Sequence, residues 1–137
     1  MNETLYLAYP SRLDVKAKLV ATKLEAKGFV VEEANEKRLE GSLVLLLLDM
    51  ATTVDEIYAS APWLEKQFEY SSLKALRLMP FLLYRSSLGE VDDQVENNPV
   101  GETFESLLSG EFKPYGFDED ADDPLIEFDR VLETYSE

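Results

Sequence analysis

The sequence of 137 residues predicts a single α/β domain with a mostly parallel sheet of four to five strands, and three observations lead to this fold class. Short apolar runs alternate with longer segments whose apolar residues recur at helical spacing. A strand, a helix, a glycine and a second strand follow one another between residues 4 and 32, which is typical of parallel pairing. Residues 42–48 form a continuous apolar run, as expected of a central strand covered on both faces.

The first strand and the first helix have recognisable limits. Residues 4–8 are predicted to form the strand, and residues 13–26 show the periodicity of a helix. Ser11 is predicted to cap this helix, with Asp14 as the acidic partner of a capping box. Gly28 is predicted to supply the left-handed residue that ends it. The expected buried stripe of the helix consists of Val15, Leu19, Val20, Ala21 and Leu24.

The remaining elements complete the predicted fold. Further strands are expected over residues 29–32, 43–49 and 79–84, with an edge strand over 112–115. Helices are expected over residues 54–58, 63–78 and 104–108, and from 124 to about 135. Residues 88–101 are predicted to be an acidic loop, and the acidic run over 118–123 to cap the last helix. No repeat or boundary divides the chain, so residues 1–137 are predicted to be one flavodoxin-like three-layer sandwich.

The composition restricts the chemistry that this chain can perform. It has no Cys and no His, which removes disulfides, thiol nucleophiles and the commonest general base and metal ligand. The net charge of −15 disfavours nucleic acid and anionic membranes as partners and favours basic ones. The N-terminus lacks a basic secretory region and the longest apolar run is too short to cross a bilayer, so we expect a cytoplasmic protein.

The carboxyl ends of the parallel strands form the predicted ligand-binding edge, because open α/β sheets bind ligands there. No phosphate-binding glycine loop, metal motif or nucleophile elbow is present, and no metal site is predicted. Each arginine at this edge either serves an anionic ligand such as a nucleotide or neutralises a nearby carboxylate, and both roles stay open. The carboxylates expected within reach are Asp14, Glu32 and Asp49. The residues predicted to contact a ligand at this edge are Tyr9, Ser11, Arg12, Asp49 and Arg85.

The helix expected over residues 63–78 supplies further candidates. Trp63 and Gln67 are four residues apart and share one face, and Glu65 and Glu69 form a second pair. A lone carboxylate at the sheet edge can stabilise an oxocarbenium-like centre. Glu65 and Glu69 are therefore both candidates for such a carboxylate, with Trp63 and Gln67 as candidate ligand contacts. The alternative is that Trp63 is an apolar anchor and both glutamates are solvated.

Several segments together resemble a Toll/interleukin-1 receptor (TIR) domain of the bacterial type. They are residues 5–12, 19–31, 42–49, 58–69, 79–83 and 107–132. The resemblance implies a signalling or protein-interaction module that acts with a protein partner or as a homo-oligomer. Gln67 stands where the family has its catalytic Glu, four residues after Trp63, so the resemblance implies no NAD⁺ hydrolysis here. The stretch between Val31 and Ser42 is also too short for the loop and helix of TIR–TIR contacts.

Two other interpretations compete with this one. The opening Tyr6-Leu7-Ala8-Tyr9-Pro10 and the pair Phe68-Glu69 are similar to nucleoside 2-deoxyribosyltransferase-like proteins. That resemblance implies an N-ribosyl hydrolase or transferase in which Glu69 is the nucleophile and NAD or a nucleoside is the ligand. A degenerate receiver domain is the third interpretation, with Asp49 at the phosphoacceptor position and Lys113-Pro114 as its lysine-proline pair. The acidic pair that such a domain needs after its first strand is missing, so no Mg²⁺ site is expected.

Overall fold

The computed structural model describes residues 4–34, 43–62, 77–108 and 114–134, and the structural statements below concern these ranges. They contain one five-stranded sheet in the order β2-β1-β3-β4-β5, in which every neighbouring pair is parallel. The strands are β1 (Thr4–Ala8), β2 (Val30–Glu33), β3 (Leu43–Leu48), β4 (Arg77–Tyr84) and β5 (Tyr115–Asp118). This is the order of a flavodoxin-like sheet, and the predicted fold class is confirmed.

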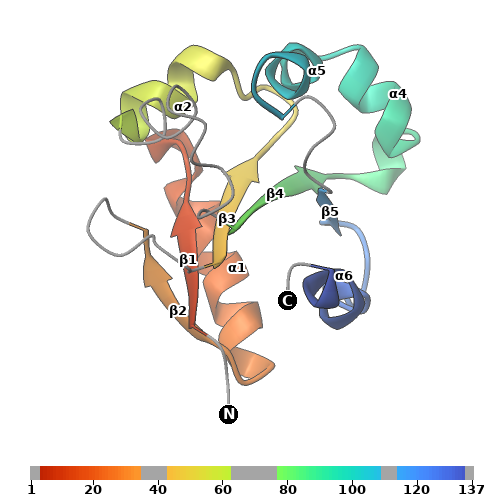
Figure 1. Cartoon of the computed structure of the whole chain (residues 1–137). Coiled ribbons are helices and arrows are strands. Elements are labelled where there is room, and N and C mark those ends of the chain that lie inside the picture. The colour runs from red at the N-terminus through yellow and green to blue at the C-terminus, as the bar shows by residue number, and fades with distance from the viewer. Residues whose placement is uncertain (1–3, 35–42, 63–76, 109–113, 135–137) are drawn as a thin grey trace.

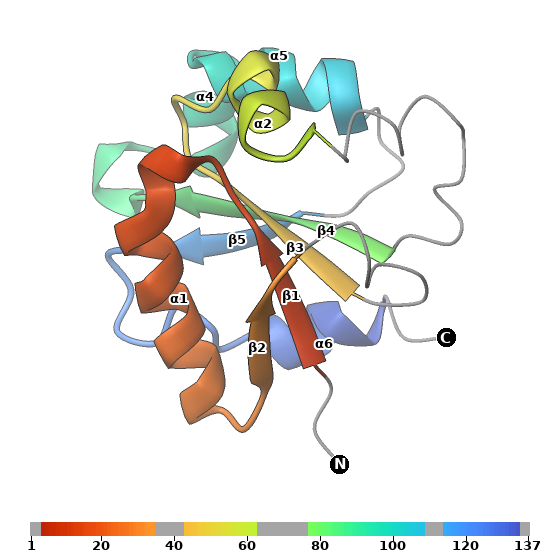
Figure 2. The ribbon, with the colours of Figure 1, turned by 90° about the vertical axis from the view of Figure 1, so that its left-hand side faces the viewer.

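Helices cover both faces of the sheet (Figures 1 and 2). On one face lie α1 (Asp14–Ala26) and α6 (Phe128–Glu133). On the other lie α2 (Val54–Ser60), α4 (Val91–Glu96) and α5 (Pro99–Thr103). Shorter turns are η1 (Ser11–Leu13), η4 (Ser86–Leu88) and η5 (Phe104–Leu108), the last a π-helix. The three layers follow from the parallel connections, which place each crossover helix on a face of the sheet.

The apolar run in the middle of the chain forms the centre of the sheet. All six residues of β3 are at most 1% exposed. Successive side chains of a strand point to opposite faces. Leu43, Leu45 and Leu47 therefore pack in the core under α1 and α6, and Val44, Leu46 and Leu48 pack in the core under α2 and α5. The uniform hydrophobicity of β3 is explained because both of its faces are covered by helices.

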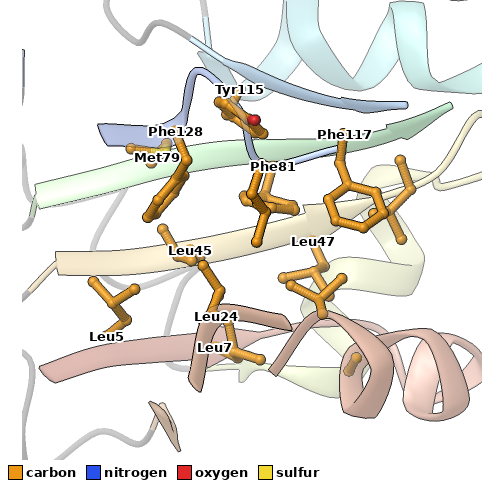
Figure 3. Close-up of a cluster of buried hydrophobic side chains, with 14 of the residues drawn as sticks. Leu5, Leu7, Leu24, Leu45, Leu47, Met79, Phe81, Tyr115, Phe117 and Phe128 are labelled. Carbon is orange, nitrogen blue, oxygen red and sulfur yellow. The ribbon is translucent and has the colours of Figure 1, made fainter. Parts of the chain in front are cut away.

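Aromatic rings fill the core between the sheet and α6 (Figure 3). Phe81 of β4 lies against Tyr115 and Phe117 of β5, with ring centroids 5.2 and 5.6 Å apart. Phe128 of α6 meets Tyr115 edge to face at 5.4 Å. The Tyr115 hydroxyl donates a hydrogen bond of 2.6 Å to the carbonyl of Pro124, which connects the edge strand β5 to the segment before α6.

The details of α1 differ from the prediction. Ser11 does not cap it through its side chain; Ser11 begins η1, and its backbone N–H donates to Ser60 Oγ at 3.0 Å. Val15 and Leu19 are 79% and 47% exposed. Val20 and Leu24 are buried and Ala21 packs against the core, as predicted, but the buried face is shifted toward the small Ala17, which allows close approach to the sheet. The residues buried along this face are Leu13, Ala17, Val20 and Leu24. Gly28 ends the helix as predicted, with φ of 102°.

Several predicted limits in the second half of the chain were wrong. Residues 88–101 are not a loop, because α4 and most of α5 lie there. The helix expected over 63–78 does not reach its predicted end, since β4 begins at residue 77; residues 63–76 lie outside the described ranges. The edge strand begins at Tyr115 and runs to Asp118, whereas residues 112 and 113 are not described. The last helix begins at Phe128, so the acidic run does not cap it.

Candidate functional site

The carboxyl ends of the five strands meet at one edge of the sheet, because all strands run in the same direction. The residues after β1 lead to Arg12, β3 is followed directly by Asp49, and β4 is followed directly by Arg85. After β5 comes an acidic turn that contains Asp120. This edge is where the sequence predicted a ligand site, and the structure forms two ionic groups there.

Arg12 joins the first helical segment to the turn after β3. Its Nη1 and Nη2 donate to Asp49 Oδ2 and Oδ1 at 2.8 and 2.9 Å. Its Nε and Nη2 donate to Glu56 Oε2 and Oε1 at 2.8 and 2.9 Å. Both contacts are forked, two-point pairings that suit a planar guanidinium. We call Arg12, Asp49 and Glu56 the Arg12 clamp.

The backbone of the turn after β3 holds Asp49 in place. Asp49 Oδ1 accepts hydrogen bonds from the Ala51 N–H at 3.1 Å and from Thr52 Oγ1 at 2.8 Å. Thr53 then caps α2 by accepting from the N–H of Glu56 at 3.2 Å. An aspartate turn and a threonine cap are typical of a strand that passes into a helix. The local sequence therefore positions both carboxylates of the clamp.

The clamp keeps both carboxylates ionised. Burial raises the pKa of Asp49, but hydrogen bonds from Arg12 and Thr52 outweigh it, and the pKa lies below its ordinary value. The hydrogen bonds from Arg12 also lower the pKa of Glu56. The Asp49 side chain is 16% exposed and the Arg12 side chain 43% exposed. One guanidinium against two carboxylates leaves the clamp with a net negative charge.

Arg85 belongs to a second group at the same edge. Its Nε and Nη2 donate to Asp120 Oδ1 at 3.2 and 3.0 Å. Asp120 Oδ2 also accepts from the Ser87 N–H at 2.9 Å, and this bond, with those from Arg85, lowers the pKa of Asp120 to about 2. Asp118 Oδ1 accepts from the backbone N–H groups of Ser86 and Asp120, both at 3.0 Å. We call Arg85, Asp118 and Asp120 the Arg85 cluster.

The structure thus places the predicted arginines in two separate groups. Of the two roles left open by the sequence, pairing with local carboxylates is the one seen for both, with Asp49 as one predicted partner. Glu56 and Asp120 were missed as partners. Glu56 had one detectable signal, since it lies in the first turn of the helix after Asp49. The sequence pattern around Asp120 favours a helix cap instead, because the acidic run precedes the last predicted helix.

The other predicted ligand contacts have smaller roles. The Tyr9 hydroxyl lies 3.5 Å from Asp14 Oδ1, and burial together with Glu33 and Asp14 raises the Tyr9 pKa. Ser11 contributes its backbone N–H to Ser60, as described above. Trp63, Gln67 and the candidate catalytic Glu69 lie outside the described residues, so their roles stay predictions.

In the described part of the chain, no group of three or more acidic side chains is arranged to hold a metal ion. None of the helices in this part combines the length and the apolar character needed to cross a membrane. Comparison with protein-family models, with curated proteins and with solved structures found no match.

Proposed function

We propose that this chain is a non-catalytic protein-interaction module that binds a partner with a basic surface. The observation that carries the proposal is the pairing at the carboxyl edge. Arg12 is held by two carboxylates and Arg85 by one, so both arginines that the sequence offered to an anionic ligand already have anionic partners. Lys16, which lies nearby on α1, pairs with Glu119 at 3.1 Å.

This arrangement disfavours a nucleotide at the edge. A phosphate group would have to displace Asp49 and Glu56 from Arg12, although both already accept forked, charge-assisted hydrogen bonds. Its charge would also meet a group whose net charge is negative. The net charge of −15 acts in the same direction, since it repels anions and attracts cations over the whole surface. The sheet is of the type that both resembled families share, so it does not discriminate between them.

The interaction half of the proposal is tested by binding. The purified chain is immobilised, and partners are captured from the cells in which it is naturally made. Each candidate is then purified and its Kd measured at ionic strengths of about 0.05 and 0.3 M. We expect a basic partner whose binding weakens at least about tenfold at the higher salt, because exposed charges are screened over a few ångströms there. If no purified candidate binds, the interaction module is excluded.

The non-catalytic half is tested with the substrates of the competing interpretation. The protein is incubated with NAD⁺ and with deoxynucleosides, and release of nicotinamide or free base is followed. We expect no release, because Gln67 cannot supply the negative charge that stabilises a ribosyl cation. Turnover that is abolished in Glu69→Gln but retained in Gln67→Ala would establish a glycosidase or transferase and contradict this proposal.

A further inference from the structure

A groove of about 770 Å³ runs between α4 and the α5–η5 segment, on the face of the sheet that also carries α2. This volume is in the range of sites that bind small molecules and peptide side chains. Figures 1 and 2 both place α4 beside α5. The apolar part of its lining consists of Val95, Pro99, Gly101 and Phe104. Val95 and Phe104 are half-buried and continue into the core around Val100, so the apolar surface of the groove is anchored to the sheet.

Acidic side chains stand on both sides of this apolar surface. Asp92 and Glu96 lie four residues apart on α4, and Glu102 and Glu105 lie three apart on α5 and η5. Like charges at these spacings repel one another on a helix. Within the described residues none of the four forms an ion pair, whereas Asp49, Glu56 and Asp120 at the carboxyl edge do. The chain has no Lys or Arg between Arg85 and Lys113 that could neutralise them.

The groove is held open by contacts that do not involve its charges. The N–H of Val100 donates to Met50 O at 3.2 Å, and Thr103 Oγ1 donates to Thr52 O at 2.9 Å, which fastens α5 to the turn after β3. A Cβ atom at Gly101 would lie only 2.4 Å from Val95 O, so the absence of a side chain there permits the close approach of the two helices. A groove that exists before binding requires little ordering when a partner enters.

The turn between the helices adds hydrogen-bond acceptors. Asn97 Nδ2 donates to Asp93 O at 2.8 Å, and Asn98 Nδ2 donates to Gln94 O at 2.7 Å. These bonds fix both amides, and neither Oδ1 has a donor among the residues that the structure describes. Both asparagines line the groove. Their oxygens can therefore accept hydrogen bonds from the N–H groups of an incoming backbone.

We infer that the α4–α5 groove docks a basic peptide segment of the partner, with one apolar anchor against Val95 and Phe104 and Lys or Arg side chains between the two pairs of carboxylates. The inference rests on the proposed function and identifies the surface of this chain that would contact the partner. Charge complementarity selects a basic occupant, and the apolar surface and the acceptor oxygens select a peptide rather than a simple polycation.

The experiment uses synthetic peptides in which a single Phe or Leu is flanked by Lys or Arg, and measures Kd by fluorescence anisotropy. Two groove variants each remove two charges: Asp92→Asn with Glu96→Gln, and Glu102→Gln with Glu105→Gln. The control, Glu25→Gln with Asp122→Asn, removes the same charge from exposed positions outside the groove. We expect each groove variant to weaken binding at least about fivefold, and the control to change it less than about twofold, because exposed charges act over roughly a Debye length.

The peptide itself tests the apolar part of the inference. Replacing its anchor by Ala should weaken binding about tenfold or more, because the buried apolar area is lost. In ¹⁵N–¹H spectra the shifted amides should belong to residues 92–105. Equal weakening by the control and the groove variants, competition by spermidine as strong as by the peptide, or shifts elsewhere would each overturn the inference. A purified partner that binds the groove variants as tightly as the original chain would overturn it too, while leaving the proposed function intact.

Discussion

Arg12→Ala should destabilise the fold, because the Arg12 clamp connects η1 to the turn after β3 and to α2. The substitution removes four hydrogen bonds to carboxylates and leaves Asp49, only 16% exposed, beside Glu56 with no cation between them. A hydrogen bond to a charged group contributes about 1.5–3 kcal/mol, and an exposed ion pair about 0–1 kcal/mol. Because Arg12 is 43% exposed, we expect a total loss of about 1–3 kcal/mol rather than the sum of four strong bonds.

The assay is urea unfolding near neutral pH, with Lys18→Ala as the matched control. Lys18 pairs with Asp14 at 3.3 Å, but the two side chains are 77% and 51% exposed, so its loss should change stability by less than about 0.5 kcal/mol. The Arg12 variant should also lower the Tm by roughly 3–10 °C. Equal stability of the two variants would refute the structural role of the clamp. Nucleotide binding that is lost in Arg12→Ala at unchanged Tm would restore the anionic-ligand role.

The stabilisation by the Arg12 clamp should depend on pH, because it requires ionised Asp49 and Glu56. The pKa values of Asp49 and Glu56 are lower in the folded chain than in the unfolded chain. Their contribution is therefore present above the unfolded values of about 3.9 and 4.3, and is lost as the pH falls through the lower folded values. The stability difference between the original chain and Arg12→Ala should stay constant near neutral pH and shrink below about pH 4. A difference that widens on acidification contradicts the clamp.

Three further substitutions test the fold. Leu46→Asp should abolish the folded circular dichroism spectrum, since a buried unpaired carboxylate at the centre of β3 costs several kcal/mol, about as much as the whole stability; Leu46→Met should remain folded. Gly101→Ala should lose about 1–3 kcal/mol in urea unfolding because of its contact with Val95 O, although alanine is the better helix former; a gain in stability would contradict this. Tyr115→Phe should lose about 1–3 kcal/mol, because the Pro124 carbonyl loses its donor. Burial raises the Tyr115 pKa to about 12, so stability should also fall between about pH 10 and 12 in the original chain, and less steeply in Tyr115→Phe.

Most of the sheet could be predicted from the sequence because its signals are local and strong. The apolar run of β3 requires cover on both faces, and the short strand–helix–strand unit before it requires parallel pairing. The buried face of α1 could not be predicted from size alone. Val15 and Leu19 are larger than Ala17, yet Ala17 faces the sheet because close approach needs a small side chain. The choice of face is made by the surface onto which the helix packs.

The α4–α5 region was predicted to be a loop because its residues favour one. Each helix is only five or six residues long; α4 carries three acids, and Gly101 lies inside α5. Isolated helices of this length are unstable in water. The shorter one, α5, is held in place because Val100 and Thr103 bond to the turn after β3. These contacts connect residues about fifty positions apart, so no local sequence pattern predicts them.

In the candidate site, too, one pairing could be predicted from the sequence and another could not. The rule that ligands and charged residues gather at the carboxyl ends of parallel strands brought Arg12 and Asp49 together correctly. The same rule could not assign Asp120 to Arg85, because that pairing depends on where β5 ends and how its acidic turn folds back.

The distribution of charge connects these observations to function. A chain with 13 Lys and Arg against 28 Asp and Glu cannot pair every acid with a cation. The acids that do form ion pairs therefore indicate where the fold requires a negative charge to be neutralised. At the carboxyl edge, Arg12 neutralises Asp49 in the turn after β3, and Arg85 neutralises Asp120 in the turn after β5. Among the residues that the structure describes, the acids of the α4–α5 groove have no such partner, although they repel one another along two short helices. A cation that entered from outside would relieve that repulsion, which is why we propose this groove as the surface that binds a basic partner.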